Sequence, residues 1–416
     1  MREIITMNEL VESIESNQAV LPPHLLCASS DSGCGSVIEL MLQVPEYTIL
    51  FVAPFGCSRH ISVYPCELTG RLYKLAFSEV DVVVGRQTEM VEEAVAQIIQ
   101  DKPDTKGIVI CASCIDRLLA TDYDYLRESL EQRYEIPIYM EWMNPVLAKC
   151  HPHEENLPHM MKWMHPENVQ VDKKIVITLG RLHRYAETSE MRMLLKEAGI
   201  DEIIHLTDCN TLEDFNRMGH AVLTIVMYPF GERAAKYLEE TYGIPYVVCT
   251  PTYDPDEIHN YYAEIGEKLG VTIDDSKYYE KIKQELQEAR KLTAGKTFAV
   301  GEIISSTRNA FHNARTLVKD GFRVEYIFAG PETGGKEADI LWMKEHSRET
   351  KLVAITDPEA LNLMENPLEA DYAVGVLEDW YAKAQHTKWI NFDEEPQNGD
   401  YDSIHRLLVE MGVYHE

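Results

Sequence analysis

Short runs of β-branched residues alternate with helix-like segments along the whole chain, and this alternation limits the fold more than any other feature. Runs of this kind are typical of parallel strands that are buried on both faces. They are YTILFVA, VDVVVG, GIVICA, IPIYM, KIVITLG, EIIHLT, VLTIVMY, IPYVVCT, TFAVGEI, VEYIFA, KLVAIT and YAVGV. The segments between them show helical spacing, and three end in glycine, as helices often do: SEMRMLLKEAG, GERAAKYLEETYG and FHNARTLVKDG. The alternation predicts an α/β fold with parallel sheets.

The length of the chain sets the number of such layers. With 416 residues it is long enough for two or three domains of about 150 residues each. We place one boundary in the Pro/His-rich stretch 150–171, where Pro158 is expected to interrupt any helix. The other lies near the charged helix 275–292. The expected organisation is three Rossmann-like domains, residues 1–165, 166–275 and 276–416.

The charge balance excludes several kinds of partner. The 69 acidic residues outnumber the 39 basic ones and give a net charge of -30, which repels nucleic acid and anionic membrane surfaces. No apolar run approaches the roughly 18 residues that a membrane span needs. The start, MREIITMNELVESIES, lacks the basic and apolar regions of a signal peptide. We therefore expect a cytoplasmic protein with no nucleic-acid or membrane partner.

Cysteines are concentrated in the first predicted domain, and several directly follow a predicted strand. Cys57 follows YTILFVAPFG, Cys111 and Cys114 close the run GIVICASC, and Cys34 lies in the glycine-flanked DSGCGS. Thiolates that converge from three loops suit soft metals and iron-sulfur clusters. Two other interpretations stay open: a single cysteine is usually a small buried apolar residue, and the spacing of Cys111 and Cys114 also fits a thioredoxin-like redox pair. No glycine-rich phosphate motif follows any run, so a nucleotide site is not expected.

The order and spacing of three cysteine segments resemble component 1 of nitrogenase and its relatives. The segments are GCGS around Cys34, APFGCSRH around Cys57, and a strand followed by SCIDRLLATD around Cys114. FSEVDVVVGRQTEMVEEAVAQII is similar to the family's strand-and-helix segment, and LEDFNRMGHAVLTIV, LEETYGIPYVV and DEIHNYYAEIGEKLG are similar to segments of its second domain. The resemblance covers most of the chain and implies a nitrogenase component 1-like fold of three Rossmann-like domains.

The resemblance also implies a metal centre. In that family the three cysteines bind an iron-sulfur cluster, 4Fe-4S or a larger P-cluster-like one, at the interface of two homologous subunits. Residue matching carries the ligand role to Cys34, Cys57 and Cys114. The remaining cysteines of the domain have no clear counterpart and either pack around the cluster or supply a substitute ligand: Cys27, Cys66 and Cys111. The sequence departs from the family at Ile115, where the family has proline, and at 120–122, where it has Gly-Asp-Asp.

A second set of candidate residues lies around the first domain boundary. After KKIVITLG come Arg181, His183 and Arg184, with no cysteine where the family's active-site metal cofactor would be held. A nitrogenase-type cofactor bound in the standard way is therefore not expected, while another metal or an organic cofactor stays open. Two arginines in an acidic protein favour an anionic substrate. We assign these three residues to catalysis, although a single loop histidine is more often a polar surface residue.

The Pro/His-rich stretch adds a further group of histidines. His151 and His153 are the candidates for cofactor binding, because this part of the chain lies near the cofactor cavity in the family that the sequence resembles. His159 and His165 follow at six-residue spacing. The stretch lacks the zinc-protease pattern of two histidines on one helix face.

The resemblance implies a division of labour with other proteins. An ATP-hydrolysing iron-sulfur reductase would pass electrons to the cluster, and the chain would form a homo- or heterodimer with a homologous subunit and reduce a small-molecule substrate. The alternative is a scaffold protein for metallocluster assembly, which needs the cluster but no turnover. A third possibility, a periplasmic-binding-like sensor with structural cysteines, is disfavoured by the missing signal peptide.

Overall fold

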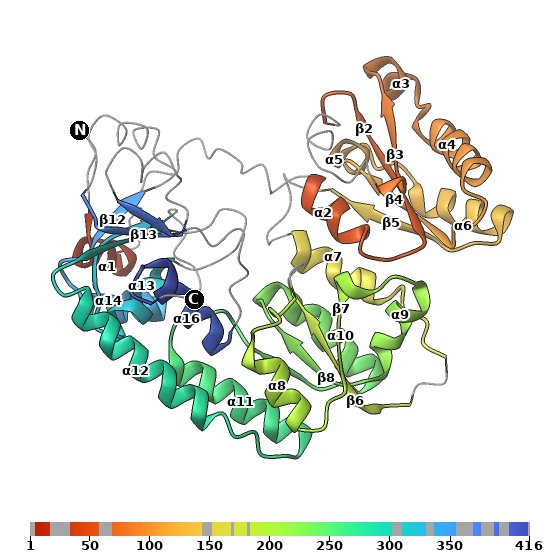
Figure 1. Ribbon diagram of the computed structural model, residues 1–416. Helices are drawn as coiled ribbons and strands as arrows, with labels where there is room; N and C mark the ends of the chain where they lie inside the picture. The colour runs from red at the N-terminus through yellow and green to blue at the C-terminus, as the bar shows by residue number, and fades with distance from the viewer. Residues whose placement is uncertain are drawn as a thin grey trace. The chain divides into compact units, whose positions relative to one another are not determined.

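The computed structural model describes residues 5–16, 34–57, 69–143, 152–167, 170–180, 184–301, 310–329, 337–354, 369–375, 387–390 and 399–414. It shows an α/β fold with three separate sheets (Figure 1). The chain forms two compact units. Unit 1 holds Met1–Ala28, Tyr185–Gly199 and Cys249–Glu416, and unit 2 holds Ser29–Arg184 and Ile200–Val248. The three sheets confirm the predicted fold class, and the domain boundaries at 165 and 275 stay a prediction.

The first sheet of unit 2 is built from four parallel strands in the order β3-β2-β4-β5. Its strands are β2 (Tyr47–Pro54), β3 (Leu72–Phe77), β4 (Gly107–Ala112) and β5 (Ile138–Trp142). Its helices are α2 (Cys34–Met41), α3 (Glu79–Val84), α4 (Gln87–Asp101), α5 (Cys114–Leu118) and α6 (Tyr123–Tyr134). Every residue of β4 is buried, as expected for a strand covered on both faces.

One predicted strand was wrong. The run VDVVVG forms most of helix α3, and the strand of this region is the preceding segment, β3 (LYKLAF), which the hydrophobic pattern missed. Ser78 and Asp81 form a reciprocal capping box at the start of α3, and Gly85 ends it in a left-handed conformation with φ 72°. These end signals outweigh the β preference of the valines.

The second sheet of unit 2 has the same form, with four parallel strands in the order β7-β6-β8-β9. Its strands are β6 (Asp172–Leu179), β7 (Glu202–His205), β8 (Ala221–Val226) and β9 (Tyr246–Val248). The helices beside them are η5 (Leu206–Asp208), α9 (Leu212–Arg217), η6 (Met218–His220), η7 (Pro229–Gly231) and α10 (Glu232–Tyr242).

Helix α7 (Pro152–Met161) corrects a second expectation, because Pro158 lies inside it and does not end it. Proline removes one helical hydrogen bond. The loss is offset by burial: Leu157, Met160 and Met161 all pack in one hydrophobic core with residues of both sheets of unit 2.

The sheet of unit 1 has six strands in the order β1-β12-β11-β10-β13-β14. They are β10 (Thr297–Gly301), β11 (Arg323–Ala329), β12 (Lys351–Ala354), β13 (Tyr372–Val374), β14 (Lys388–Ile390) and the short β1 (Ile5–Thr6), which alone among the described strands runs antiparallel. The described helices of this unit are α1 (Met7–Ser16), α8 (Glu190–Glu197), α11 (Pro255–Leu269), α12 (Ser276–Leu292), α13 (Ala310–Lys319), α14 (Glu337–His346) and α16 (Tyr401–Glu410).

The pairing of β1 with β12 places the start of the chain in this sheet rather than beside the first domain, and no sequence pattern indicated it. The helical segments predicted from glycine stops are confirmed as α8, α10 and α13. Their glycines, Gly199, Gly243 and Gly321, all adopt positive φ. In the described part of the chain, no helix is both long and apolar enough to cross a membrane.

Candidate functional site

The carboxyl edge of the first sheet carries the candidate site. Numbered along the chain, its strands lie in the spatial order 2-1-3-4, so the winding reverses between β2 and β4. Open α/β sheets bind ligands in the crevice at such a switch point, beyond the carboxyl ends of the strands. Val52 of β2 lies beside Ala112 of β4 in the parallel ladder, so the two strands end together.

Two of the predicted ligands meet at this edge. Cys57 lies three residues beyond β2, after the turn through Gly56, and Cys114 is the first residue of α5, directly beyond β4. Both side chains are partly buried. Burial raises the pKa of the Cys57 thiol, and the nearby charge of Cys114 raises it further, which places the two sulfurs close together. A bound metal cation would reverse this shift, because thiolates are the ligand form.

The third predicted ligand is placed only by its backbone. Cys34 is the first residue of α2, and its side chain lies outside the described residues, as do Cys27 and Cys66. Its role therefore stays a prediction. Cys111 is fully buried in β4 within the hydrophobic core, which assigns it to packing. Across the described residues, no three His, Cys, Asp or Glu side chains form a metal-binding group.

Two polar residues that the sequence patterns did not single out position these segments. Arg71 donates to the backbone carbonyls of Leu42, Val44 and Tyr47 at 2.6 to 3.0 Å, which fixes the end of α2 against the start of β2. Asp116 is fully buried below Cys114 and accepts a hydrogen bond from Ser113 Oγ at 3.2 Å. Burial raises the pKa of Asp116. A Ser-x-x-Asp spacing at the helix start was the available signal.

The second sheet also has the order 2-1-3-4, with its switch point between β6 and β8. Arg181 and His183, which directly follow β6, lie outside the described residues. Arg184 is described: it is exposed and forms an ion pair with Asp208 at 3.1 Å, so its guanidinium already has a carboxylate partner. His205 ends β7 at this edge, is buried, and accepts a hydrogen bond at Nδ1 from the backbone of Thr207. The sequence offered no signal for it beyond its place at a strand end.

The predicted cofactor-binding histidines are not placed as side chains. His151 lies outside the described residues, and His153 is described only as backbone, in the first turn of α7. Two other histidines of the stretch face β5: His159 contacts Glu141, and His165 contacts Tyr139.

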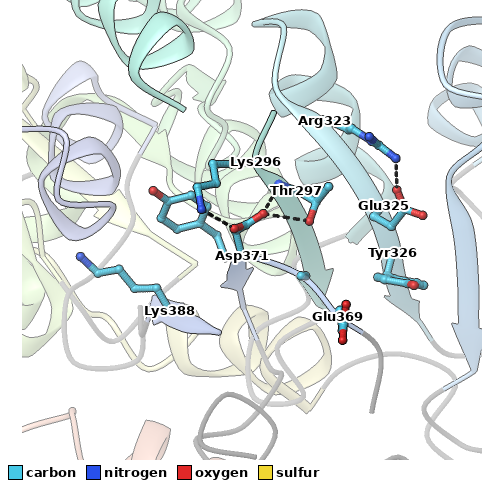
Figure 2. Close-up of a pocket in the computed structure, with 10 residues that line it drawn as sticks. Lys296, Thr297, Arg323, Glu325, Tyr326, Glu369, Asp371 and Lys388 are labelled. Atoms are coloured by element: carbon cyan, nitrogen blue, oxygen red, sulfur yellow. Dashed lines mark hydrogen bonds and ion pairs between the residues drawn. The ribbon is translucent and has the colours of Figure 1, made fainter. Parts of the chain in front are cut away.

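A hollow of about 800 Å³ in unit 1 lies at the opposite kind of edge (Figure 2). It is lined by the first residues of β10, β11, β13 and β14. Lys296 binds Asp371 at 2.6 Å and Arg323 binds Glu325 at 2.8 Å, as the dashed lines in Figure 2 show. Because this is the amino edge and these charges are paired with each other, we do not assign the hollow a ligand.

Comparisons with known proteins agree with this geometry. The 2-1-3-4 sheets and the sulfur donors at a switch point define an α/β protein of metal-binding type. The family model for nitrogenase component 1 type oxidoreductase matches residues 34–392. The chain therefore belongs to the nitrogenase component 1 type oxidoreductase family.

Individual relatives are distant. One of the subunits of the light-independent protochlorophyllide reductase of Jannaschia sp. (strain CCS1) is 26% identical over 196 residues, covering 45% of this chain and 37% of the relative. The corresponding polypeptide of Synechococcus sp. (strain JA-3-3Ab) is 22% identical over 209 residues, covering 45% of this chain and 40% of the relative. The matched part thus spans about two fifths of these curated relatives.

Solved structures support the fold. Nitrogenase Cp1 at pH 6.5 superposes with a TM-score of 0.72 at 15% identity, covering 96% of this chain and 95% of that one. Nitrogenase Cp1 at pH 5 gives a TM-score of 0.64 at 17% identity, covering 96% and 90%. At these identities the likeness concerns the fold alone.

Proposed function

We propose that the chain is a catalytic-component subunit of a nitrogenase-like reductase that holds an iron-sulfur cluster and relays low-potential electrons to a small-molecule substrate. An ATP-hydrolysing iron-sulfur reductase supplies the electrons, and a homologous subunit, a copy or a paralogue, completes the dimer. The observation that carries the proposal is the meeting of Cys57 and Cys114 at the switch point of the first sheet, in a chain of this family.

The donor chemistry fits such a cluster. Cys57, Cys114 and Cys34 would hold it through sulfur, the ligand that iron-sulfur clusters prefer. When bound, the cluster would supply one-electron chemistry at low potential. The protein's part is to present two sulfurs from neighbouring strand ends and to limit the access of water, since both side chains are partly buried.

Exposed apolar side chains around the two cysteines support a protein partner at this face. They lie in the connections that follow β2, β3 and β4, and their exposed fractions range from 51% to 84%: Phe55, Val80, Val83, Val84, Leu118 and Leu119. Apolar side chains gathered in this way are typical of interaction sites. We assign this set, called here the apolar rim, to the docking of the reductase.

Substrate binding is proposed for the carboxyl edge of the second sheet, with Arg181, His183 and Arg184 and the histidines His151 and His153. Support comes from its switch point, where α/β sheets bind ligands. Arg184→Ala is expected to weaken the binding of an anionic substrate, and unchanged binding would remove this residue from the site.

The first experiment is iron and acid-labile sulfide analysis with electron paramagnetic resonance on protein purified without oxygen. Wild type is expected to contain several irons per dimer, and Cys57→Ala and Cys114→Ala to lose them. Cys249→Ala is the matched control, because Cys249 is a fully buried thiol far from this edge in sequence and in the other unit. Wild type that stays iron-free after reconstitution would refute the proposal. A cluster that passes to an acceptor protein without substrate reduction would favour the scaffold alternative.

A further inference from the structure

We propose that Glu141 and His159 form a proton-accepting pair coupled to the redox site: they take up one proton when a low-potential one-electron donor adds one electron to the group held by the cysteines, and release it on oxidation. This inference rests on the proposed function. It assigns a role to one histidine of the Pro/His-rich stretch that the candidate site leaves unused.

The pair has the geometry of a proton-transfer site. Glu141 Oε2 lies 3.2 Å from His159 Nδ1, and the Glu141 side chain is 2% exposed whereas that of His159 is 51% exposed. A buried carboxylate therefore orients an imidazole whose outer part reaches solvent. Carboxylates hold catalytic and metal-binding histidines in this way, because the bond at Nδ1 fixes the ring and leaves Nε2 to exchange protons.

The position of Glu141 links the pair to the cysteine edge. Glu141 lies beside Cys111 in the parallel ladder of β4 and β5, and the next pair along, Ala112 and Trp142, is the last before Cys114. Adjacent strands and residues have spacings of a few ångströms, so Glu141 lies within about 10 Å of that edge. At this distance one added electron changes the proton affinity of the pair about tenfold.

The charges around the pair keep it close to titration. Burial raises the pKa of Glu141, and the hydrogen bond from Glu141 raises the pKa of His159. Lys162 lowers both values, and Glu155 raises that of His159.

The elements packed against α7 add few further charges. Helix α10 contributes Arg233, which is paired with Glu154 at 3.0 Å, α2 carries only the exposed Glu39, and η7 carries none. The one proton taken up per electron is therefore expected to reside on Glu141 and His159.

The test is the pH dependence of the midpoint potential of the reconstituted protein, measured by mediated redox titration between about pH 6 and 8.5. We expect the wild-type potential to become more negative as pH rises, and Glu141→Gln and His159→Gln to lose this slope. His165→Gln is the matched control, because His165 pairs with the neutral Tyr139 two residues along the same face of β5, at 3.3 Å, and should keep the slope.

A pH-independent wild-type potential, or a slope that persists in both variants, would overturn the inference alone. Wild type that never loads iron would overturn the proposed function and this inference with it. Should Glu141→Gln fail to fold, His159→Gln decides, since its side chain is half exposed. Proton uptake during electrochemical reduction, followed with a pH indicator in weak buffer, gives a second reading and should fall from about one proton per electron to near zero in that variant.

Discussion

At the scale of single residues, the clearest consequence concerns Glu190 of α8. It is buried and accepts hydrogen bonds from Tyr262 Oη at 2.5 Å and from the backbone N–H groups of Tyr401 and Asp402 at 2.7 and 3.1 Å. It thereby holds the first turn of α16 against α8. Burial and the neighbouring Asp400 raise the pKa of Glu190 to about 7.

A carboxyl group whose pKa is higher in the folded than in the unfolded protein loses stability as it ionises. The unfolding free energy of wild type should therefore fall as pH rises from about 4.5 to about 7, by up to about 1.4 kcal/mol per pH unit. Glu190→Gln cannot ionise, so this fall should disappear. Denaturant titrations of both proteins across this range measure the difference, and parallel curves would contradict the prediction.

At the scale of elements, a charged seam joins α13 to α11 and α14. His312 of α13 lies 3.2 Å from Glu257 and 3.5 Å from Asp339, and one and two turns along Arg315 and Lys319 bind Asp339 and Asp254 at 2.8 and 2.5 Å. Burial lowers the pKa of His312, but its two carboxylate partners outweigh it and raise the pKa to about 9.

A histidine whose pKa is raised on folding stabilises the fold fully below about pH 6.5, and this stability is lost as pH rises through about 9. His312→Gln should lower the unfolding free energy by about 2 to 3 kcal/mol at pH 6, and by much less at pH 9.5. His346→Gln, on the exposed face of α14, is the control. A loss that does not change with pH would show that packing alone explains the effect.

Helix α3 permits a test of docking that leaves the fold intact. None of its residues is buried, and Val80 and Val83 are 67% and 84% exposed. Val80→Asp/Val83→Asp should leave the thermal midpoint within about 2 °C of wild type, since exposed substitutions cost little. Binding of the purified reductase should weaken at least about tenfold, because two apolar contacts are lost and charge is buried. Glu79→Gln, on the same helix, controls for surface change. Unaltered binding would exclude α3 from the docking face.

At the scale of the whole molecule, the sequence predicted the three sheets and the cysteine edge because buried strands and the ends of parallel strands leave local signals. β3 was missed because Lys74 interrupts its apolar pattern, and α3 was taken for a strand because its valines face outward and follow no helical stripe. The supports of the site, Arg71 and Glu141, could not be predicted. Arg71 binds backbone carbonyls 24 to 29 residues away, and Glu141 meets His159 across 18 residues, so only the fold brings them together.

Charge and cluster together govern how two chains associate. Each chain carries a net charge of -30, so two copies repel each other, and raising the salt from about 0.05 to about 0.5 M should tighten a homodimer because screening shortens the range of that repulsion. A cluster that bridges two subunits binds only the dimer, so loading it should tighten the dimer further by mass action. Sedimentation of cluster-free and reconstituted protein at both salt concentrations measures the two effects. Dissociation constants that do not change on loading would show that the cluster lies within one chain, and a dimer weakened by salt would point to a basic, non-identical partner subunit.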